Sequence, residues 1–321
     1  MTPPPALVSI LVPCYNAQRW LAATLESALG QTWPRCEIIV VDDGSRDGSL
    51  ALARQFESRG VKVIAQANAG AAAARNTALR AARGDYLQFL DADDLIAPDK
   101  ITRQMQRLAG GPPGAIASSA WARFQLDPLE ADFRPEPAWR DFPVAVDFLR
   151  LHFNEGWMMF PAAWLVPRSV AEAAGPWDTR LSLNDDGEYF CRVIVAASAI
   201  LFCGDARSFY RSGMPGSLSW RKDAAAYRSL VLSIELNTAT LFRHADTPAT
   251  REALANAWNK LAHEIYPTLP AESRRALQRC REFGGPTRPV EMGARLQRWS
   301  NLIGWRLAKR LQQFLRARGA S

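Results

Sequence analysis

The sequence predicts an α/β protein with a mostly parallel central sheet flanked by helices, followed by an α-helical C-terminal region. Short apolar runs rich in β-branched residues alternate with helix-like segments through the first 124 residues, the pattern of β-α-β units. These runs are apolar at almost every position, as expected of parallel strands buried on both faces. Only helical patterns follow residue 220. We therefore expect one α/β domain over 1–220 and a helical region over 221–321.

The first half supplies the elements of the sheet in order. We expect strands over 7–12, 37–41, 61–65, 86–90 and 115–124. Helical spacing of apolar residues predicts helices over 20–29, 47–58, 69–82 and 98–109. Because the carboxyl ends of parallel strands share one edge of a sheet, the loops that follow these strands should lie close together.

The middle of the chain is less regular. Residues 125–161 are rich in proline and tryptophan and predict loops and short helices, either a functional lid or a variable surface insertion. A strand over 162–166, a short helix over 169–174 and a turn at 175–178 are expected next. A helix over 184–197 opens with several acids, and a strand over 198–203 follows it.

The C-terminal region is the basic part of the chain. The net charge is +7, and residues 270–321 hold twelve Arg or Lys against three Glu, so the rest is slightly acidic. Residues 295–318 predict one amphipathic helix with an apolar stripe and seven basic residues. Such a helix suits the anionic face of a membrane, or packs on the catalytic domain or on a second subunit. The near-neutral first domain argues against nucleic-acid binding.

Several protein classes are disfavoured. Five cysteines without CxxC spacing suggest neither a disulfide framework nor a zinc site. The N-terminus lacks a secretory signal pattern, and the longest apolar run, 193–203, is too short to span a bilayer. We expect a cytoplasmic location, either free or associated with the inner face of the plasma membrane. No GxxxxGK[ST] or GxGxxG motif is present, which disfavours P-loop and nicotinamide-binding folds.

Acids follow two of the predicted strands at their carboxyl ends. Asp42 and Asp43 follow the second strand, and Asp91, Asp93 and Asp94 follow the fourth. Like charges gathered in this way call for a cation, and hard divalent metals take carboxylates together with substrate phosphates. The alternative is that the acids favour a helix N-terminus. We expect Asp91 and Asp93 to serve a metal-diphosphate site and Asp94 to serve the next helix.

Several motifs, in order, resemble those of family-2 glycosyltransferases, which have the GT-A fold. They are Val8–Asn16, Ser27–Thr32, Ile39–Ser45, Asn68–Leu79, the DxD-like Asp91–Asp93, Gly175–Asp178 and the pair Asp185–Asp186. The resemblance covers about residues 6–220. It implies an inverting enzyme that moves a sugar from a nucleotide-diphospho-sugar to an acceptor hydroxyl, in bacterial surface polysaccharide or glycoconjugate synthesis. The acceptor would be a saccharide or a lipid-linked sugar.

The resemblance also implies roles for single residues. Pro13 and Tyr15 would border the nucleotide base, and Asp43, with Asp42 beside it, would accept from a ring N–H of the base. Arg75 would pair with the diphosphate. The donor and its divalent metal, Mn²⁺ or Mg²⁺, would be held by Asp91 and Asp93, and Asp93 would be the direct ligand. Asp186 would be the general base, and Arg192 would be structural or reach the acids.

The sequence departs from the family pattern in two places. Asp185 stands where a glutamate is usual, which leaves open whether Asp185 or Asp186 is the base. Near the end of the domain no histidine is present, so Arg211 or the loop through Ser217 would cover the diphosphate.

Other functions remain as alternatives. One is a nucleotidyltransferase or another metal-dependent enzyme that binds nucleotide-sugars, although a nucleotidyltransferase would normally carry a Gly- and Lys-rich loop after the first strand. A phosphatase would carry its DxD motif after the first strand, not the fourth. A non-catalytic scaffold with a basic tail is the third.

Overall fold

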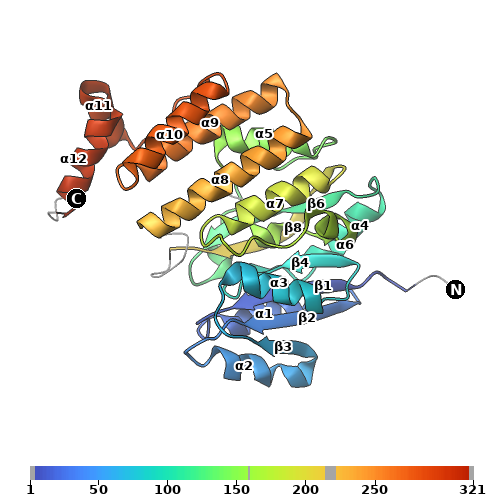
Figure 1. Cartoon of the computed structure of the whole chain (residues 1–321). Helices are drawn as coiled ribbons and strands as arrows, with labels where there is room; N and C mark the ends of the chain where they lie inside the picture. Colours follow the sequence, from blue (N-terminus) through green and yellow to red (C-terminus); the bar gives the residue numbers. More distant parts are fainter. Residues whose placement is uncertain (1–3, 158–159, 214–221, 318–321) are drawn as a thin grey trace. The chain divides into compact units, whose positions relative to one another are not determined.

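The computed structural model in Figure 1 describes residues 4–157, 160–213 and 222–317. The chain divides into two compact units. The first comprises 1–149 and 158–220 and contains all the strands; the second comprises 150–157 and 221–321 and is helical in its described part. One helix, α5 (Val146–Glu155), passes from the first unit into the second.

The first unit is built on a five-stranded sheet with the order β3-β2-β1-β4-β7. Its four parallel strands are the four expected first, namely β1 (Val8–Cys14), β2 (Cys36–Asp42), β3 (Val61–Ala65) and β4 (Tyr86–Phe89). Ile10, Ile39 and Leu87 are fully buried, which explains why these strands are apolar at consecutive positions. The predicted α/β class with a mostly parallel sheet is confirmed.

The helices between these strands also match the prediction within a few residues. They are α1 (Leu21–Leu29), α2 (Ser49–Gln55) with the 3-10 turn η1 (Glu57–Arg59), α3 (Ala71–Ala81) and α4 (Lys100–Ala109). Buried apolar residues such as Leu25 and Ile101 lie at positions of the predicted helical pattern, and polar residues such as Arg75 are buried beside them.

A second, three-stranded sheet holds the remaining strands. It consists of β5 (Leu95–Ile96), β8 (Ile200–Arg211) and β6 (Ile116–Phe124), with β8 in the centre, antiparallel to β5 and parallel to β6. The strand expected at 115–124 therefore exists but does not extend the first sheet. The strand expected at 198–203 continues to Arg211, because β8 pairs along its length with β6 across an irregularity between Ser119 and Ala120.

The strand expected at 162–166 is present only at its end. Residues Pro161–Ala163 form the 3-10 turn η3, Leu165 forms an isolated bridge with Ala117, and β7 (Val166–Pro167) pairs with β4 in antiparallel direction. Pro161 stands at the start of η3, where the fixed φ of proline suits a helical turn. The irregular region before it contains the 3-10 turn η2 (Pro128–Glu130) and α5. Helices α6 (Arg168–Ala174) and α7 (Asp185–Ala196) lie where they were expected.

The second unit consists of helices α8 (Ala224–His244), α9 (Pro248–Ile265), α10 (Pro270–Glu282), α11 (Ala294–Ile303) and α12 (Trp305–Ala317). Trp258, Leu261 and Ile265 of α9 pack with Ala276 and Cys280 of α10 in its apolar core. None of the helices described in the structure has the length and apolar character needed to cross a membrane.

The single helix expected at 295–318 is two helices. Gly304 separates them with a φ of 78°, a backbone conformation that residues with a Cβ rarely adopt. The apolar spacing continues across the break, which is why the sequence pattern did not reveal it.

Candidate functional site

The carboxyl ends of β1, β2 and β4 meet at one edge of the sheet. β1 lies between β2 and β4, and Cys14 pairs with Asp42 in the register of β1 and β2. The chain order reverses direction between β1 and β4, and in open α/β sheets ligands bind beyond the strand ends at such a point. Pro13 lies near the carboxyl end of β1 and Tyr15 directly follows the strand at this edge; Tyr15 is about half exposed. The predicted base-binding residues are thus brought to one place.

The two acids after β2 are both buried but have different partners. The Asp43 carboxylate accepts hydrogen bonds from Gln66 Nε2 (2.7 Å), Ala69 N (2.9 Å) and Gly70 N (2.8 Å). It therefore shapes the loop that starts α3, where Gly70 has a φ of 91°. Asp42 Oδ2 accepts from Ser45 N.

Among the atoms that the structure describes, Asp42 Oδ1 is buried and has no hydrogen-bond partner. An unpaired buried acceptor is costly and invites a donor from a ligand. Both oxygens of Asp43 already accept from the protein, so its bond to a base N–H stays a prediction, and Asp42 Oδ1 is a second candidate acceptor.

Arg75 of α3 joins the acids after β4 to the acids that open α7. Its NH2 lies 2.7 Å from Asp91 Oδ1, its NH1 lies 2.7 Å from Asp185 Oδ2, and its side chain is almost fully buried. Burial lowers the pKa of Arg75, but the charges of Asp91 and Asp185 outweigh it and raise the pKa above its ordinary value. In this structure the guanidinium is engaged with carboxylates that lie 16 and 110 residues away in sequence.

The aromatic residues beneath Arg75 fix its position. Its guanidinium lies 4.5 Å from the ring centroid of Trp177, and Trp177 stacks on Tyr189 with centroids 4.0 Å apart. A cation over an aromatic face gains further attraction when both are desolvated. Asn76, the next residue on α3, binds the Trp177 backbone twice, through its Nδ2 to O (2.9 Å) and its Oδ1 from N (2.8 Å).

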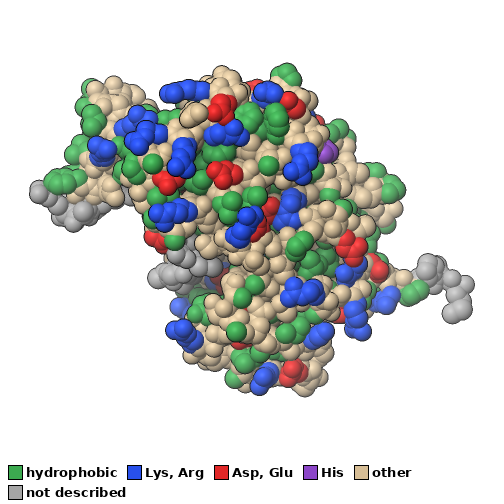
Figure 2. All heavy atoms as spheres, viewed as in Figure 1, with side chains coloured by type: hydrophobic (Ala, Val, Ile, Leu, Met, Phe, Trp, Pro, Cys, Tyr) green, Lys and Arg blue, Asp and Glu red, His purple; other side chains and the backbone are tan. Residues whose placement is uncertain are grey.

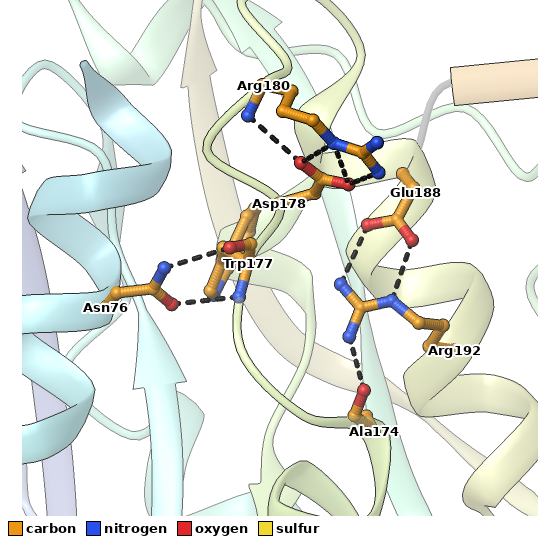
Figure 3. A network of polar contacts seen from close by, with 7 residues as sticks. All are labelled: Asn76, Ala174, Trp177, Asp178, Arg180, Glu188 and Arg192. Carbon is orange, nitrogen blue, oxygen red and sulfur yellow. Dashed lines mark hydrogen bonds and ion pairs between the residues drawn. The ribbon is translucent and has the colours of Figure 1, made fainter. Parts of the chain in front are cut away.

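Figure 3 shows the contacts that hold the turn around Trp177 and the helix α7. Glu188 binds Arg192 through two 2.7 Å contacts, and Arg192 also donates to the carbonyl of Ala174. Asp178 pairs with Arg180 on the same loop. Arg192 thus has the structural role that was one of its two predicted alternatives. The importance of Asn76 and Trp177 was visible in the sequence only as part of longer motifs.

The acid pair at the start of α7 has one member with a raised pKa. Burial, then the charge of Asp185, raises the pKa of Asp186 from 3.8 to about 7, while Arg75 opposes the rise. Asp186 Oδ1 accepts from Gly187 N at 2.8 Å. A carboxyl group with this pKa is poised to take up a proton near neutral pH. Asp185, by contrast, is tied to Arg75.

The sequence suggested that Asp94 serves the next helix, α4, but the structure gives it a different partner. Its side chain is fully buried and accepts from Arg211 N of β8 at 2.7 Å, and α4 begins after Asp99 instead. Burial, then the charges of Asp93 and Asp91, holds the pKa of Asp94 well above its usual range. The physical reason is that β5 follows Asp94 directly and pairs with β8, which draws Asp94 onto that strand.

Arg211 is engaged with the backbone of the acid loop. Its Nε donates to the Asp93 carbonyl at 2.8 Å, and its NH1 donates to the Gln125 carbonyl. Its guanidinium also lies 4.0 Å from the ring centroid of Trp20 and 4.3 Å from that of Phe124. These contacts give Arg211 a role in holding the acid loop, and its contact with a diphosphate stays a prediction. The loop through Ser217 lies outside the described residues.

The acid loop suits a divalent cation. Burial, then the charge of Asp91, raises the pKa of Asp93 to about 6, and the charge of Arg211 opposes the rise. No group of three His, Cys, Asp or Glu that would hold a metal occurs among the residues with described positions. Two carboxylates are nevertheless enough for Mg²⁺ or Mn²⁺ when substrate phosphates supply the other oxygen ligands.

Comparison with known proteins decides the family. The profile described as "Glycosyl transferase family 2" matches residues 9–171, about half of the chain. The chain belongs to this family. It is 42% identical over 103 residues to the putative teichuronic acid biosynthesis glycosyltransferase TuaG of Bacillus subtilis, and that match covers 31% of this chain and 41% of TuaG.

A second family-2 relative gives a match of similar extent. The glucosyltransferase WfgD of Escherichia coli is 39% identical over 103 residues, which cover 32% of this chain and 41% of WfgD. The chain thus spans about two fifths of the length of these curated relatives.

Solved structures confirm the GT-A fold of this family-2 protein. S. aureus TarS in complex with UDP-GlcNAc matches with a TM-score of 0.71 and 16% identity, over 86% of this chain and 81% of the TarS chain. The mannosyltransferase PcManGT of Pyrobaculum calidifontis, in complex with GDP-Man and Mn²⁺, matches with a TM-score of 0.55 and 21% identity, over 98% and 81%.

Proposed function

We propose that this protein is an inverting glycosyltransferase that moves a sugar from a nucleotide-diphospho-sugar to an acceptor hydroxyl. The observation that carries the proposal is the Arg75 bridge, because it joins Asp91 of the donor loop to Asp185, the neighbour of the proposed base. A single displacement needs both groups close together, one to bind the donor and one to deprotonate the acceptor.

Each step has a residue suited to it. Tyr15 and Pro13 border the base, and Asp42 accepts from it, with Asp43 holding the surrounding loop. Asp91 and Asp93 would hold a divalent metal, which when bound stabilises negative charge on the leaving diphosphate. Asp186 takes the proton from the acceptor hydroxyl as that oxygen attacks the anomeric carbon, and the sugar–phosphate bond breaks on the opposite side.

Asp186 is the better candidate for the base than Asp185. The Asp185 carboxylate is occupied by its ion pair with Arg75 and is therefore not available to a substrate. The pKa of Asp186 lies near 7, close to the value that maximises general-base catalysis at neutral pH. Arg75 then orients the pair instead of binding the diphosphate directly.

The names of two relatives support a proposal for the acceptor class. TuaG carries a name that refers to teichuronic acid biosynthesis, and WfgD is named for glucosyl transfer to GlcNAc-diphosphoundecaprenol. These names support a saccharide or lipid-linked acceptor in bacterial surface polysaccharide synthesis. We propose that this transfer takes place at the cytoplasmic face of the membrane. TarS and PcManGT were solved with UDP-GlcNAc and GDP-Man, which supports a nucleotide-sugar donor with Mn²⁺ or Mg²⁺.

A donor screen tests the proposal. We expect one of UDP, GDP, dTDP and CMP, with Mn²⁺ or Mg²⁺, to raise the melting temperature well above the others, since ligand binding stabilises by mass action. With the matching donor, Asp93→Ala and Asp186→Asn should each slow transfer by at least about 100-fold, while Asp132→Asn, at an exposed aspartate, should not. Transfer at wild-type rates in both site variants contradicts the assignment. Release of pyrophosphate from a nucleoside triphosphate supports a nucleotidyltransferase instead.

A further inference from the structure

Helix α12 is attached to the second unit by one face. The Trp305 ring lies 4.0 Å from the ring of His263 and 5.2 Å from that of Tyr266, measured between centroids. Ala308 is fully buried, and Lys309 Nζ donates to the His263 carbonyl. These contacts fix which side of α12 faces the end of α9 and which side faces away from it.

The side of α12 that lies away from Trp305 is apolar and exposed. At about 100° per residue, Leu307 lies about 160° and Leu311 about 120° around the helix axis from Trp305. Leu307 is 56% exposed and Leu311 38%. At the junction of the two helices, Leu302 of α11 is 82% exposed and Ile303 is 45% exposed. Large apolar side chains gathered in this way on a surface usually mark a binding site.

The charge around this face has one sign. Residues 294–317 contain six Arg or Lys and no Asp or Glu. Arg306 and Arg310 are exposed and lie beside the apolar face of α12, and Arg295 and Arg298 are exposed on α11. Figure 2 shows basic and apolar side chains side by side on the segment that α11 and α12 form in Figure 1.

We propose that α11 and α12 form a docking surface for an anionic lipid membrane. Exposed leucines beside Arg306 and Arg310, on two helices without an acidic residue, match the acyl boundary and the negatively charged headgroups of such a bilayer. A second copy of this chain would bring two positive surfaces together, which disfavours self-association through this face. Membrane binding through α11 and α12 does not require glycosyl transfer. The consequence that it brings the enzyme to a lipid-linked acceptor rests on the proposed function.

Vesicle binding of the full chain tests this surface. The probes are vesicles of phosphatidylcholine containing phosphatidylglycerol, with pure phosphatidylcholine for comparison, in a co-sedimentation assay. The apolar variant is Leu307→Gln with Leu311→Gln, and its control is Leu129→Gln, at a leucine that is 91% exposed in the first unit. The charge variant is Arg306→Gln with Arg310→Gln, and its control is Arg274→Gln with Arg275→Gln, two exposed residues of α10. Circular dichroism confirms that each variant is folded.

We expect binding to the anionic vesicles and little to the neutral ones. The charge variant should bind about 25-fold more weakly, from about fivefold for each cation removed. The apolar variant should lose at least tenfold, and both controls should bind as wild type. Nucleotide binding by thermal shift should be unchanged in all variants, which separates this test from that of the proposed function.

Two results overturn the proposal. One is equal binding of wild type and both surface variants to the anionic vesicles. The other is absence of wild-type binding to the anionic vesicles. If light scattering then shows a dimer that the apolar variant abolishes, the occupant of the face is a second copy.

Discussion

Replacing Arg75 tests whether its ion pairs connect the two halves of the site. Its two terminal nitrogens each bind a different carboxylate, Asp91 and Asp185. A lysine keeps the positive charge but has one ammonium on a flexible stem, so it cannot reproduce both bonds. Arg75→Lys should therefore lose one charged hydrogen bond and lower the free energy of unfolding by about 2 kcal/mol. Arg75→Met leaves two partly buried carboxylates without their cation and should cost about 3–5 kcal/mol.

The same variants should differ in the pH dependence of catalysis. Arg75 lowers the pKa of Asp186, so removing its charge raises that pKa further above about 7. The acidic limb of kcat/KM should move to higher pH by about one unit in Arg75→Met. It should stay close to wild type in Arg75→Lys, because the charge is kept. Urea unfolding at several pH values, together with pH profiles of kcat/KM, measures both effects.

The matched control is Arg80→Met, an exposed arginine on the same helix that donates only to Thr77. It should change neither the free energy of unfolding nor the pH profile. If Arg75 instead acts by binding the diphosphate, both Arg75 variants will raise the KM for the donor while the unfolding energy and the acidic limb stay at their wild-type values. That outcome refutes the bridge as a positioning device.

Further predictions concern the acids themselves. In wild type, kcat/KM should fall tenfold per pH unit below about 7, because Asp186 must be ionised to act as base. Since the folded pKa of Asp186 lies above its unfolded value of 3.8, its stabilising effect is complete below pH 3.8 and is lost as pH rises through about 7. Asp186→Asn should therefore melt at a higher temperature than wild type at pH 8 while transferring about 10²–10⁴-fold more slowly. Removal of divalent metal with a chelator should abolish transfer and added Mn²⁺ or Mg²⁺ should restore it, whereas retained activity after complete removal contradicts the metal assignment. Asp94→Asn, which keeps an acceptor for Arg211 N, should unfold within about 1 kcal/mol of wild type, and Asp94→Ala should cost about 1–3 kcal/mol by urea titration.

The parallel sheet was predictable because each strand is specified by its own short run. Four largely apolar segments, three of them rich in β-branched residues, are separated by helical patterns and allow few arrangements, and right-handed connections between parallel strands bring their carboxyl ends to one edge. The clustering of Tyr15, Asp42 and Asp91 follows from that topology alone. Strands whose existence depends on a distant partner were harder. β8 extends to Arg211 because β6 pairs with it, and the first part of the run at 162–166 is not a strand because Pro161 starts a 3-10 turn there.

The side-chain partners were not predictable, because no local pattern encodes them. Asp94 bonds to a residue 117 positions away, and Arg75 to one 110 positions away. The sequence shows that each is an acidic or basic residue within a motif. It does not show which distant group will be its hydrogen-bond partner. The break at Gly304 was missed for a related reason, since the apolar spacing that predicts a helix continues unchanged across the glycine.

The partners of each carboxylate distinguish roles that residue type leaves open. Asp185 and Asp186 are adjacent and chemically identical, yet the ion pair with Arg75 assigns Asp185 to positioning, and the raised pKa of Asp186 suits a base. Asp42 and Asp43 divide in the same way: Asp43 accepts three bonds that build the α3 loop, and Asp42 retains a buried acceptor atom without a protein partner. In each pair, the acid whose oxygens are paired with protein groups stabilises the surrounding structure. The acid that burial leaves electrostatically unsatisfied is the one that a substrate can stabilise, which is the basis of transition-state stabilisation at a preformed site.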